Sequence, residues 1–315
     1  MRITYLKKII FASNNQHKIA EVKEIMSDFE VLSIKDCGFE GDIEENASTL
    51  IGNSLIKAKT IYKFLASKGT PSPVLADDSG LFVDILDGAP GVYSARYASE
   101  NGEHSTDEEN RAKLLIEMEG AVNRKANFSC AMVLYNGDDD AKVGIGQSFG
   151  EITEFESGKL DFGYDPIFYS YDLDDKFSEV SDEEKNSVSH RGRAIKNLLE
   201  NPRKLLCMNL DAKHFENVKK GNKKYEVRLN DEKRKVLEVG DFINFTNNTT
   251  LETLVVKVTE LLHFESFDEM AKALDYADIG FNTLSESEVL ETYHTYYSKE
   301  KEHQYGVLAI KVELV

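Results

Sequence analysis

The chain has 315 residues, 41% of them hydrophobic, and a formal net charge of −18. This length predicts two domains, and the composition is typical of a globular protein with a sizeable core. The first 200 residues carry 22 basic against 36 acidic residues (net −14), and residues 201–315 carry 16 against 20 (net −4). This acidity argues against a polyanion-binding face on the first part and favours a site that recruits a divalent cation.

The sequence shows no sign of a membrane span or a secretory leader. A span needs roughly 18 consecutive apolar residues, and no run approaches that length. The apolar run Ile9–Ala12 is too short for a leader peptide. Cys37, Cys130 and Cys207 lack zinc-site spacing and suit reduced thiols, so we expect a cytoplasmic protein.

The first 200 residues predict an α/β domain. Asn14-Asn15 opens a helix whose apolar residues have helical spacing, and Thr106 with Glu109 fits a capping box. The turn Asn136-Gly137-Asp138 joins two long strands. The predicted strands are Lys8–Ser13, Glu30–Lys35, Pro73–Asp77, Ala126–Tyr135 and Lys142–Phe155, and the predicted helices include Thr49–Leu65, Thr106–Met118 and Arg191–Leu199.

A second domain is predicted after Asn201-Pro202, a pair typical of a break between elements. Short strands with few helices favour a small β-barrel there. The predicted strands are Lys204–Leu210, Lys224–Leu229, Asp241–Thr246, Thr253–Glu260 and Gly306–Leu314, and the predicted helices are Ala212–Lys220, Phe267–Leu274 and Glu286–Tyr297.

Two polar stretches near the start suit phosphate binding. Ser13-Asn14-Asn15-Gln16-His17-Lys18 lies at a strand-to-helix turn, where free N–H groups and the helix dipole attract anions. An ordinary N-cap with a surface lysine is the alternative. Glu44-Glu45 precedes Asn53 and Lys57, which share a helix face. A solvated acidic turn is the alternative for that stretch.

Asp77-Asp78-Ser79-Gly80 places two like charges between apolar segments. Such carboxylates raise each other's pKa unless a cation offsets the repulsion. At the end of a buried strand they suit Mg²⁺, which takes one or two carboxylates plus substrate phosphate oxygens. A β-turn built on Asp-Ser-Gly is the alternative.

Two later stretches suit a flat ligand. In Phe162-Gly163-Tyr164-Asp165 the glycine allows close approach and the aromatic rings can stack. Lys185 and Ser189-His190-Arg191 offer donors to a keto oxygen or a phosphate. A turn with core aromatic residues and an N-cap serine with surface basic residues are the alternatives.

The motifs SNNQHK, LADDSGL, GAPGVYSARY, FGYDPIF and EEKNSVSHRG occur in the order and spacing typical of the inosine triphosphate pyrophosphatase family. The resemblance spans about residues 8–200. It implies a two-lobed, mixed-sheet α/β fold around a cleft, a homodimer and Mg²⁺. It also implies hydrolysis of non-canonical purine triphosphates (ITP, dITP, XTP) to the monophosphate and pyrophosphate, in a domain covering residues 1–200.

The resemblance also implies roles for single residues. Asp78, with Asp77 beside it, would orient or deprotonate the attacking water, while Glu45 and Asp78 bind the metal. Donors facing a 6-keto oxygen would leave the 6-amino group of ATP without an acceptor. Leu160-Asp161 stand where the family usually has glycine. The substrate-binding residues would be Ser13, Asn14, Asn15, Lys18 and Lys57 for the phosphates, Ser79 as a further contact to the substrate, and Phe162, Gly163, Tyr164, Asp165, Lys185, His190 and Arg191 for the base.

Residues 204–315 resemble an ASCH domain, a PUA-like barrel, through the stretch MNLDAKHFENVKKGNKKYEVRLNDEKRKVLEVGDFINF. The resemblance implies an RNA or modified-nucleotide ligand. Some small relatives hydrolyse an acetylated cytidine with a lysine, a threonine and a glutamate. Lys223 and Glu288 match the lysine and the glutamate, but Glu226 stands at the threonine position.

The charge pattern points to the same part of the second domain. Residues 203–235 carry 11 basic against 5 acidic residues (net +6), so we expect Lys223 and Arg228 to belong to a basic face with salt-sensitive binding. An edge strand with solvated charges is the alternative. For the whole chain, the alternative to an enzyme is a non-catalytic nucleotide or RNA sensor.

Overall fold

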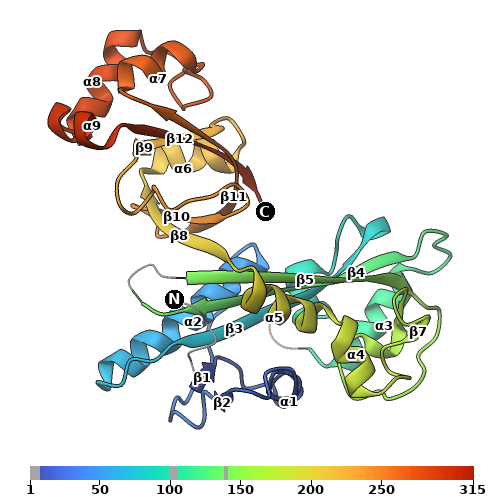
Figure 1. Cartoon of the computed structure of the whole chain (residues 1–315). Coiled ribbons are helices and arrows are strands. Elements are labelled where there is room, and N and C mark those ends of the chain that lie inside the picture. Colours follow the sequence, from blue (N-terminus) through green and yellow to red (C-terminus); the bar gives the residue numbers. More distant parts are fainter. Residues whose placement is uncertain (1–7, 100–104, 138–140) are drawn as a thin grey trace. The chain divides into compact units, whose positions relative to one another are not determined.

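The computed structural model describes residues 8–99, 105–137 and 141–315. These residues form two compact units that meet in sequence between Pro202 and Arg203 (Figure 1). Within the described ranges, no helix is long and apolar enough to cross a membrane. Asp138 of the predicted turn lies outside the described residues.

The first unit is built on one mixed sheet, whose strand order is β2-β1-β3-β4-β5, with β6 next to β5 and β7 next to β6. β1 pairs in parallel with β2 and β3, and the other pairs are antiparallel. The strands are β1 Lys8–Phe11, β2 Glu30–Ser33, β3 Val74–Val83, β4 Lys125–Tyr135, β5 Ala141–Ile152, β6 Phe168–Ser170 and β7 Asp175–Lys176.

Helices pack on both faces of this sheet, and local signals set where they begin. Thr49 accepts a hydrogen bond from the Gly52 N–H at the start of α2, and Thr106 forms the predicted capping box with Glu109 at the start of α3. The helices are α1 Gln16–Ile25, α2 Leu50–Ser67, α3 Asp107–Glu117, α4 Asp182–Val188 and α5 His190–Glu200, with 3₁₀ turns η2 Asp84–Leu86, η3 Gly91–Arg96 and η4 Asp165–Ile167.

A close contact sets α5 against the sheet. A Cβ on Gly144 of β5 would lie 2.2 Å from the Ala194 carbonyl oxygen of α5. Only glycine therefore allows α5 to lie this near to the strand, because backbone atoms cannot give way as a side chain can. This approach brings the start of α5, with His190 and Arg191, next to the centre of the sheet.

Two apolar clusters hold the first unit together, and β3 runs from one to the other. Leu75 belongs to the cluster with α1 and α5, and Leu81 belongs to the cluster with α3. Asp77, Asp78 and Ser79 lie between these two leucines on the same strand. The polar stretch therefore occupies the junction of the two cores.

This position corrects the predicted end of the strand. Pro73–Asp77 was expected to end at the aspartates, but β3 continues to Val83, and Asp77 and Asp78 pair with Met132 and Ala131 of β4. The β-turn alternative is wrong for the same reason. Continuous pairing with β4 keeps the chain extended through the polar residues. A helix over Asp182–Val188 was also not predicted, although Ser181 and Glu184 form a capping box at its start.

The second unit contains a five-stranded sheet in the order β8-β10-β11-β12-β9. β8 and β10 pair in parallel, and the other pairs are antiparallel. The strands are β8 Arg203–Leu210, β9 Tyr225–Leu229, β10 Phe242–Asn247, β11 Thr253–Phe264 and β12 Val307–Leu314, and the helices are α6 Ala212–Lys219, α7 Phe267–Ala273, α8 Glu286–Tyr296 and α9 Lys299–Tyr305.

The predicted barrel is not closed by backbone pairing. Over residues 203–315, β8 and β9 are the two edges of the sheet and share no ladder. A side chain takes the place of that ladder, because the Arg228 guanidinium of β9 donates to the Asn209 carbonyl of β8 at 3.0 Å. The two edges approach each other, but a guanidinium occupies the gap between them.

Candidate active site

Asp77 and Asp78 point to opposite faces of the sheet, because successive side chains on a strand alternate. Asp77 faces α1 and α5, where it binds Lys18 and Arg191. Asp78 faces α2, where it contacts Asn53 and Lys57. The two carboxylates therefore occupy separate environments, and their expected mutual repulsion is not the main influence on either of them.

Asp78 forms a cluster with residues of α2 and with Glu45. Asn53 donates to its carboxylate at 3.0 Å, and the Lys57 ammonium lies 3.6 Å from its other oxygen. The same ammonium is 2.8 Å from the Glu45 carboxylate. Asn53 also accepts from the Ala47 N–H at 2.9 Å, so one amide joins the Glu45 loop to the strand. The predicted grouping of Glu45, Lys57 and Asp78 is present.

The electrostatics of this cluster suit a base and a cation. Burial raises the pKa of Asp78 above its usual range, and the Glu45 carboxylate raises it further against the opposing charge of Lys57. No group of three or more metal-ligating side chains exists in the described ranges. The Glu45 and Asp78 carboxylates both contact the Lys57 ammonium and so lie close together. A pair of carboxylates fits Mg²⁺, which binds through one or two carboxylates plus substrate phosphates.

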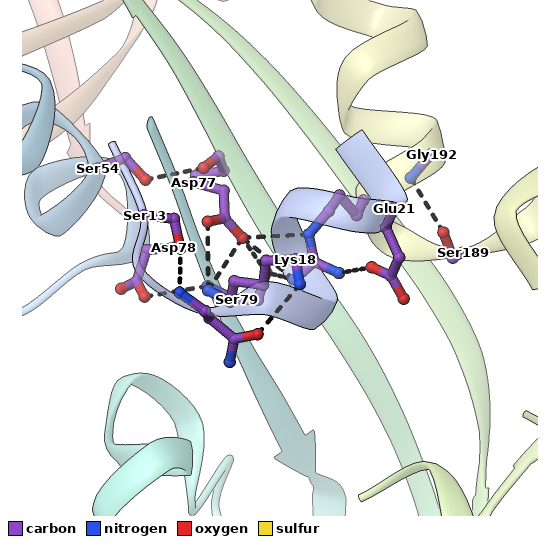
Figure 2. Close-up of polar contacts among 12 residues, drawn as sticks. Ser13, Lys18, Glu21, Ser54, Asp77, Asp78, Ser79, Ser189 and Gly192 are labelled. Carbon is purple, nitrogen blue, oxygen red and sulfur yellow. Dashed lines mark hydrogen bonds and ion pairs between the residues drawn. The ribbon is translucent and has the colours of Figure 1, made fainter. Parts of the chain in front are cut away.

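Asp77 is surrounded by cations. It lies 3.0 Å from Lys18 and 3.1 Å from Arg191, and it is 1% exposed. Figure 2 shows Asp77 next to Lys18. Burial would raise the pKa of Asp77, but Lys18 and Arg191 hold it well below its usual range. A carboxylate with a depressed pKa is a weak proton acceptor, which argues against the shared base role expected for Asp77.

Glu21 of α1 is a site residue that the sequence analysis missed. Its carboxylate binds Lys185 at 2.7 Å and also pairs with Arg191. Burial opposes ionisation, but Arg191 and Lys185 lower the pKa of Glu21 to about 2. Glu21 lies one helical turn beyond His17 and Lys18 on α1. That i, i+3 and i, i+4 spacing from the phosphate motif was the signal available in the sequence.

A cavity of about 140 Å³ opens beside these charges. Lys185 lies on its wall, 2.6 Å from Asp165, and its ammonium is 4.7 Å above the Phe162 ring. The His17 ring lies 5.2 Å from the same Phe162 ring. The lining residues are His17, Ala20, Glu21, Glu24, Lys159, Asp161, Phe162, Asp165, Phe177, Ser178, Val180, Asp182 and Lys185. Aromatic faces with a lysine and carboxylates suit a heterocycle that both accepts and donates hydrogen bonds.

Some residues predicted for the base lie elsewhere. Tyr164 is in the apolar core and donates to the Ser94 carbonyl at 2.8 Å, and Gly163 hydrogen-bonds to Asp107 and Arg111. His190 is buried and stacks on Phe128. These residues support the loop and the start of α5 rather than lining the cavity.

The buried His190 ring is neutral at pH 7. Burial, followed by the charge of Arg191, holds the pKa of His190 well below its usual range. Arg191 is 1% exposed, and its guanidinium is committed to Glu21 and Asp77. Of the expected donors to the base, Lys185 alone lies on the cavity wall.

The turn before α1 keeps its polar groups near the surface. Asn15 is the N-cap and accepts from the Lys18 N–H at 3.1 Å, while the Ser13 hydroxyl accepts from the Asn15 N–H. Asn14 is exposed. Ser79 donates to Asp77 at 3.3 Å, so its hydroxyl lies on the Asp77 face of β3. The turn therefore has the expected N-cap, but Lys18 is partly buried and paired with Asp77 instead of lying free on the surface.

Replacing Glu21 by glutamine should remove part of the acid sensitivity of the fold. The folded pKa of Glu21, about 2, lies below its ordinary 4.5. The stabilisation of the fold by the ionised Glu21 carboxylate is therefore present above pH 4.5 and is lost as the pH falls from 4.5 towards 2. The shift corresponds to roughly 3 kcal/mol. Chemical denaturation between pH 7 and pH 3 should show that the free energy of unfolding falls less steeply with pH in Glu21→Gln than in the wild type. Glu24→Gln, which removes a carboxylate of the same helix whose partner is the neutral amide of Asn186, is the matched control. Identical slopes for Glu21→Gln and wild type would contradict the assignment.

The second unit holds its own buried ion cluster. Glu226 of β9 is fully buried and lies 2.8 Å from Lys223 and 2.7 Å from Arg228. The Lys223 ammonium is 3.3 Å from His214. Burial lowers the pKa of Lys223, while burial and the charge of Lys223 lower the pKa of His214 to about 4. The alternative of solvated edge charges is therefore wrong for these side chains, although β9 is an edge strand.

The structure bears on two further expectations for this unit. Glu288 is not brought to Lys223, because its carboxylate accepts from the Ser285 N–H and hydroxyl in the capping box of α8. Three lysines of the predicted basic face are also paired with acidic residues from other segments. Lys219 pairs with Glu252, Lys224 with Asp278, and Lys204 with Glu238 and Asp241.

Replacing Glu226 by glutamine should destabilise the second unit strongly. The change leaves the buried Lys223 and the partly buried Arg228 without the Glu226 charge, and losing one partner of a buried pair costs about 3–5 kcal/mol. Calorimetric unfolding of the whole chain should show a lower transition temperature. Glu252→Gln breaks a half-exposed pair with Lys219 and should cost about 1 kcal/mol or less. Equal losses of transition temperature in Glu226→Gln and Glu252→Gln would contradict the conclusion that burial makes the Glu226 pairs important.

The fold and the site together define the first unit as an α/β domain with a carboxylate–lysine cluster on one face of β3 and a heterocycle-sized cavity near the other. Residues 9–201 match the Ham1 family, and residues 208–315 match the ASCH domain. The chain belongs to the Ham1 family and carries a C-terminal ASCH domain.

Relatives and solved structures match the first unit along nearly their whole length. A dITP/XTP pyrophosphatase of Clostridium perfringens is 47% identical over 206 residues, which are 64% of this chain and 100% of that protein. One from Treponema denticola is 45% identical, covering 60% of this chain and 94% of that protein. The Ham1 protein of Staphylococcus aureus is 41% identical with a TM-score of 0.53, covering 61% of this chain and 96% of that one. The fold class expected from the sequence is confirmed.

Proposed function

We propose that the first unit hydrolyses non-canonical purine triphosphates, dITP, XTP and ITP, to the monophosphate and pyrophosphate. The observation that carries the proposal is Asp78, a buried carboxylate with a raised pKa between Glu45 and Lys57. The names of the similar proteins supply the substrate class. The proposal includes Mg²⁺ and a homodimer in the cytoplasm, as the family resemblance implies.

In this proposal Asp78 accepts a proton from the water that attacks the α-phosphorus. The bond from that phosphorus to its bridging oxygen breaks, and pyrophosphate leaves. Glu45 and Asp78 would hold Mg²⁺, which would neutralise phosphate charge when bound. Lys57 stays protonated, because Asp78 and Glu45 raise its pKa against the effect of burial, and it can stabilise charge on the phosphates.

The base would enter the cavity between His17, Phe162 and Lys185. The Lys185 ammonium donates to a 6-keto oxygen, and Asp165 and Glu21 keep that ammonium in place. Burial opposes the charge, but Asp165 and Glu21 raise the pKa of Lys185, so it remains a donor at neutral pH. A 6-amino group offers hydrogens where the cavity also offers hydrogens, which disfavours adenine.

Pyrophosphate release from ITP, with Mg²⁺ and after its removal by a chelator, tests the activity. We expect turnover that depends on the cation. Binding of ITP without any pyrophosphate release would favour the alternative, a non-catalytic sensor.

For the ASCH domain we propose a nucleoside-containing ligand bound at Lys223, Glu226 and Arg228. The pairing of Lys204, Lys219 and Lys224 with carboxylates favours a modified nucleotide over RNA, because it leaves fewer free cations to follow a phosphate backbone. Binding by a modified nucleotide should change little between low and moderate salt and should be lost in Lys223→Met. Steeply salt-dependent binding of single-stranded RNA that survives Lys223→Met would contradict this choice.

A further inference from the structure

Six charged side chains of alternating sign form a continuous chain through the first unit. They come from α1, β3, η4, α4 and α5, and every intermediate member contacts one opposite charge on each side. Figure 2 shows the part that includes Lys18, Glu21 and Asp77. The contacts are Asp165–Lys185 at 2.6 Å, Lys185–Glu21 at 2.7 Å, Glu21–Arg191, Arg191–Asp77 at 3.1 Å, and Asp77–Lys18 at 3.0 Å.

The two ends of the chain lie at different parts of the site. Asp165, Lys185 and Glu21 line the cavity proposed for the base. Lys18 lies in the first turn of α1, beside the N-cap proposed for the phosphates. Asp77 and Arg191, at 1% exposure each, join the two ends and do not line the cavity.

Each intermediate side chain of this ion-pair chain interacts with two opposite charges, so a change in one ion pair alters the strength of the next. When Lys185 donates to an oxygen of the base, its hold on Glu21 weakens, and Glu21 binds Arg191 more strongly. Arg191 then releases part of its hold on Asp77, which binds Lys18 more firmly. These shifts are strong because low polarisability around buried charges leaves their interactions unscreened. The firmer contact with Asp77 restricts the rotamers of Lys18, and because an ammonium has three donors, Lys18 can hold this contact and still donate to a phosphate oxygen.

We propose that Asp77 is a positioning residue, and that this ion-pair chain couples recognition of the base to placement of the triphosphate. The inference rests on the proposed pyrophosphatase activity. A base that engages Lys185 would fix Lys18 beside the phosphates, and a base that does not would leave them poorly placed. Discrimination would then appear in kcat as well as in KM, because placement affects the reacting geometry.

Asp77→Asn tests this inference because it keeps the side-chain shape and removes the charge between Lys18 and Arg191. The matched control is Asp172→Asn, which removes a carboxylate 3.0 Å from Arg193, two residues beyond Arg191 on α5. We expect the ratio of kcat/KM for ITP to that for ATP to fall at least about tenfold in Asp77→Asn, with most of the change in kcat for ITP. The ratio in Asp172→Asn should equal that of wild type.

Two results with Asp77→Asn would overturn the inference. An equal fall for ITP and ATP would mean that Asp77 serves the chemistry or the fold alone. An unchanged ratio with normal turnover would mean that the chain transmits nothing. Absence of pyrophosphate release from ITP by the wild type would be a different result, since it would refute the proposed function itself.

A second measurement does not depend on the folding of a variant. Inosine and tripolyphosphate, as separate inhibitors of the wild-type enzyme, would occupy the two ends of the site. If the ends are coupled, saturating inosine should tighten inhibition by tripolyphosphate about fivefold or more. Independent inhibition by the two compounds would overturn the coupling even if Asp77→Asn failed to fold.

Discussion

Asp78→Asn should lower kcat for ITP by about 10²–10⁴-fold, the usual contribution of a general base. The change removes the proton acceptor and one of the two proposed metal ligands, while the amide keeps the size of the side chain. Stability at pH 7 should not fall. Burial and Glu45 raise the pKa of Asp78, which means that its charged form is disfavoured in the fold. Single-turnover kinetics and thermal unfolding of the same preparation measure both effects.

Asp84→Asn is the matched control, because Asp84 follows β3 directly and is exposed. It should keep wild-type turnover. If Asp78→Asn retained more than about a tenth of the wild-type rate, the base would have to be another residue. A large loss of stability in Asp78→Asn would instead indicate that its carboxylate serves mainly to hold Lys57.

ITP should exceed ATP in kcat/KM by about 10²-fold or more, since a site built to hydrogen-bond one group rejects an analogue that lacks it. The physical reason is Lys185, a buried ammonium on the cavity wall that can donate but cannot accept. Lys185→Met should bring the ITP value down towards the ATP value, which itself should change little. Initial rates over a range of both nucleotides measure the two constants.

Lys63→Met serves as the control for losing a lysine, because Lys63 is exposed on α2. It should leave both nucleotides unaffected. Lys185→Met also removes the shared partner of Glu21 and Asp165, so its thermal unfolding should be followed in parallel. Equal kcat/KM for ITP and ATP in the wild type would show that the base is not read at its 6-position.

Local patterns in the sequence were enough to predict most elements and part of the site. The capping pair Thr106 and Glu109 predicted the start of α3, because its hydrogen bonds involve neighbours in sequence. Asn53 and Lys57 were placed on one face of α2 by their spacing of four. The motif that contains Asp78 also indicated the family, which residues 9–201 confirm.

In the second unit, local patterns in the sequence did not predict which charges pair with each other. The excess of basic residues over 203–235 was correct as a count, but Glu252, Asp278, Glu238 and Asp241 come from outside that stretch and pair with three of its lysines. Glu226 suggested a solvated edge strand by its charge, yet it is fully buried between two cations. The order of charged residues along the sequence does not show which of them form ion pairs in the fold.

The family, a two-domain organisation and most of the charged residues of the site could be predicted from local motifs. The folded chain was needed to show that β3 continues through Asp77 and Asp78, that these carboxylates face opposite sides of the sheet, and that Glu21, which no motif indicated, joins Lys185 to Arg191. The physical reason is that a buried charge is stabilised by partners brought together by folding. The partners of Asp77 lie 59 and 114 residues away in the chain, beyond the reach of any local pattern.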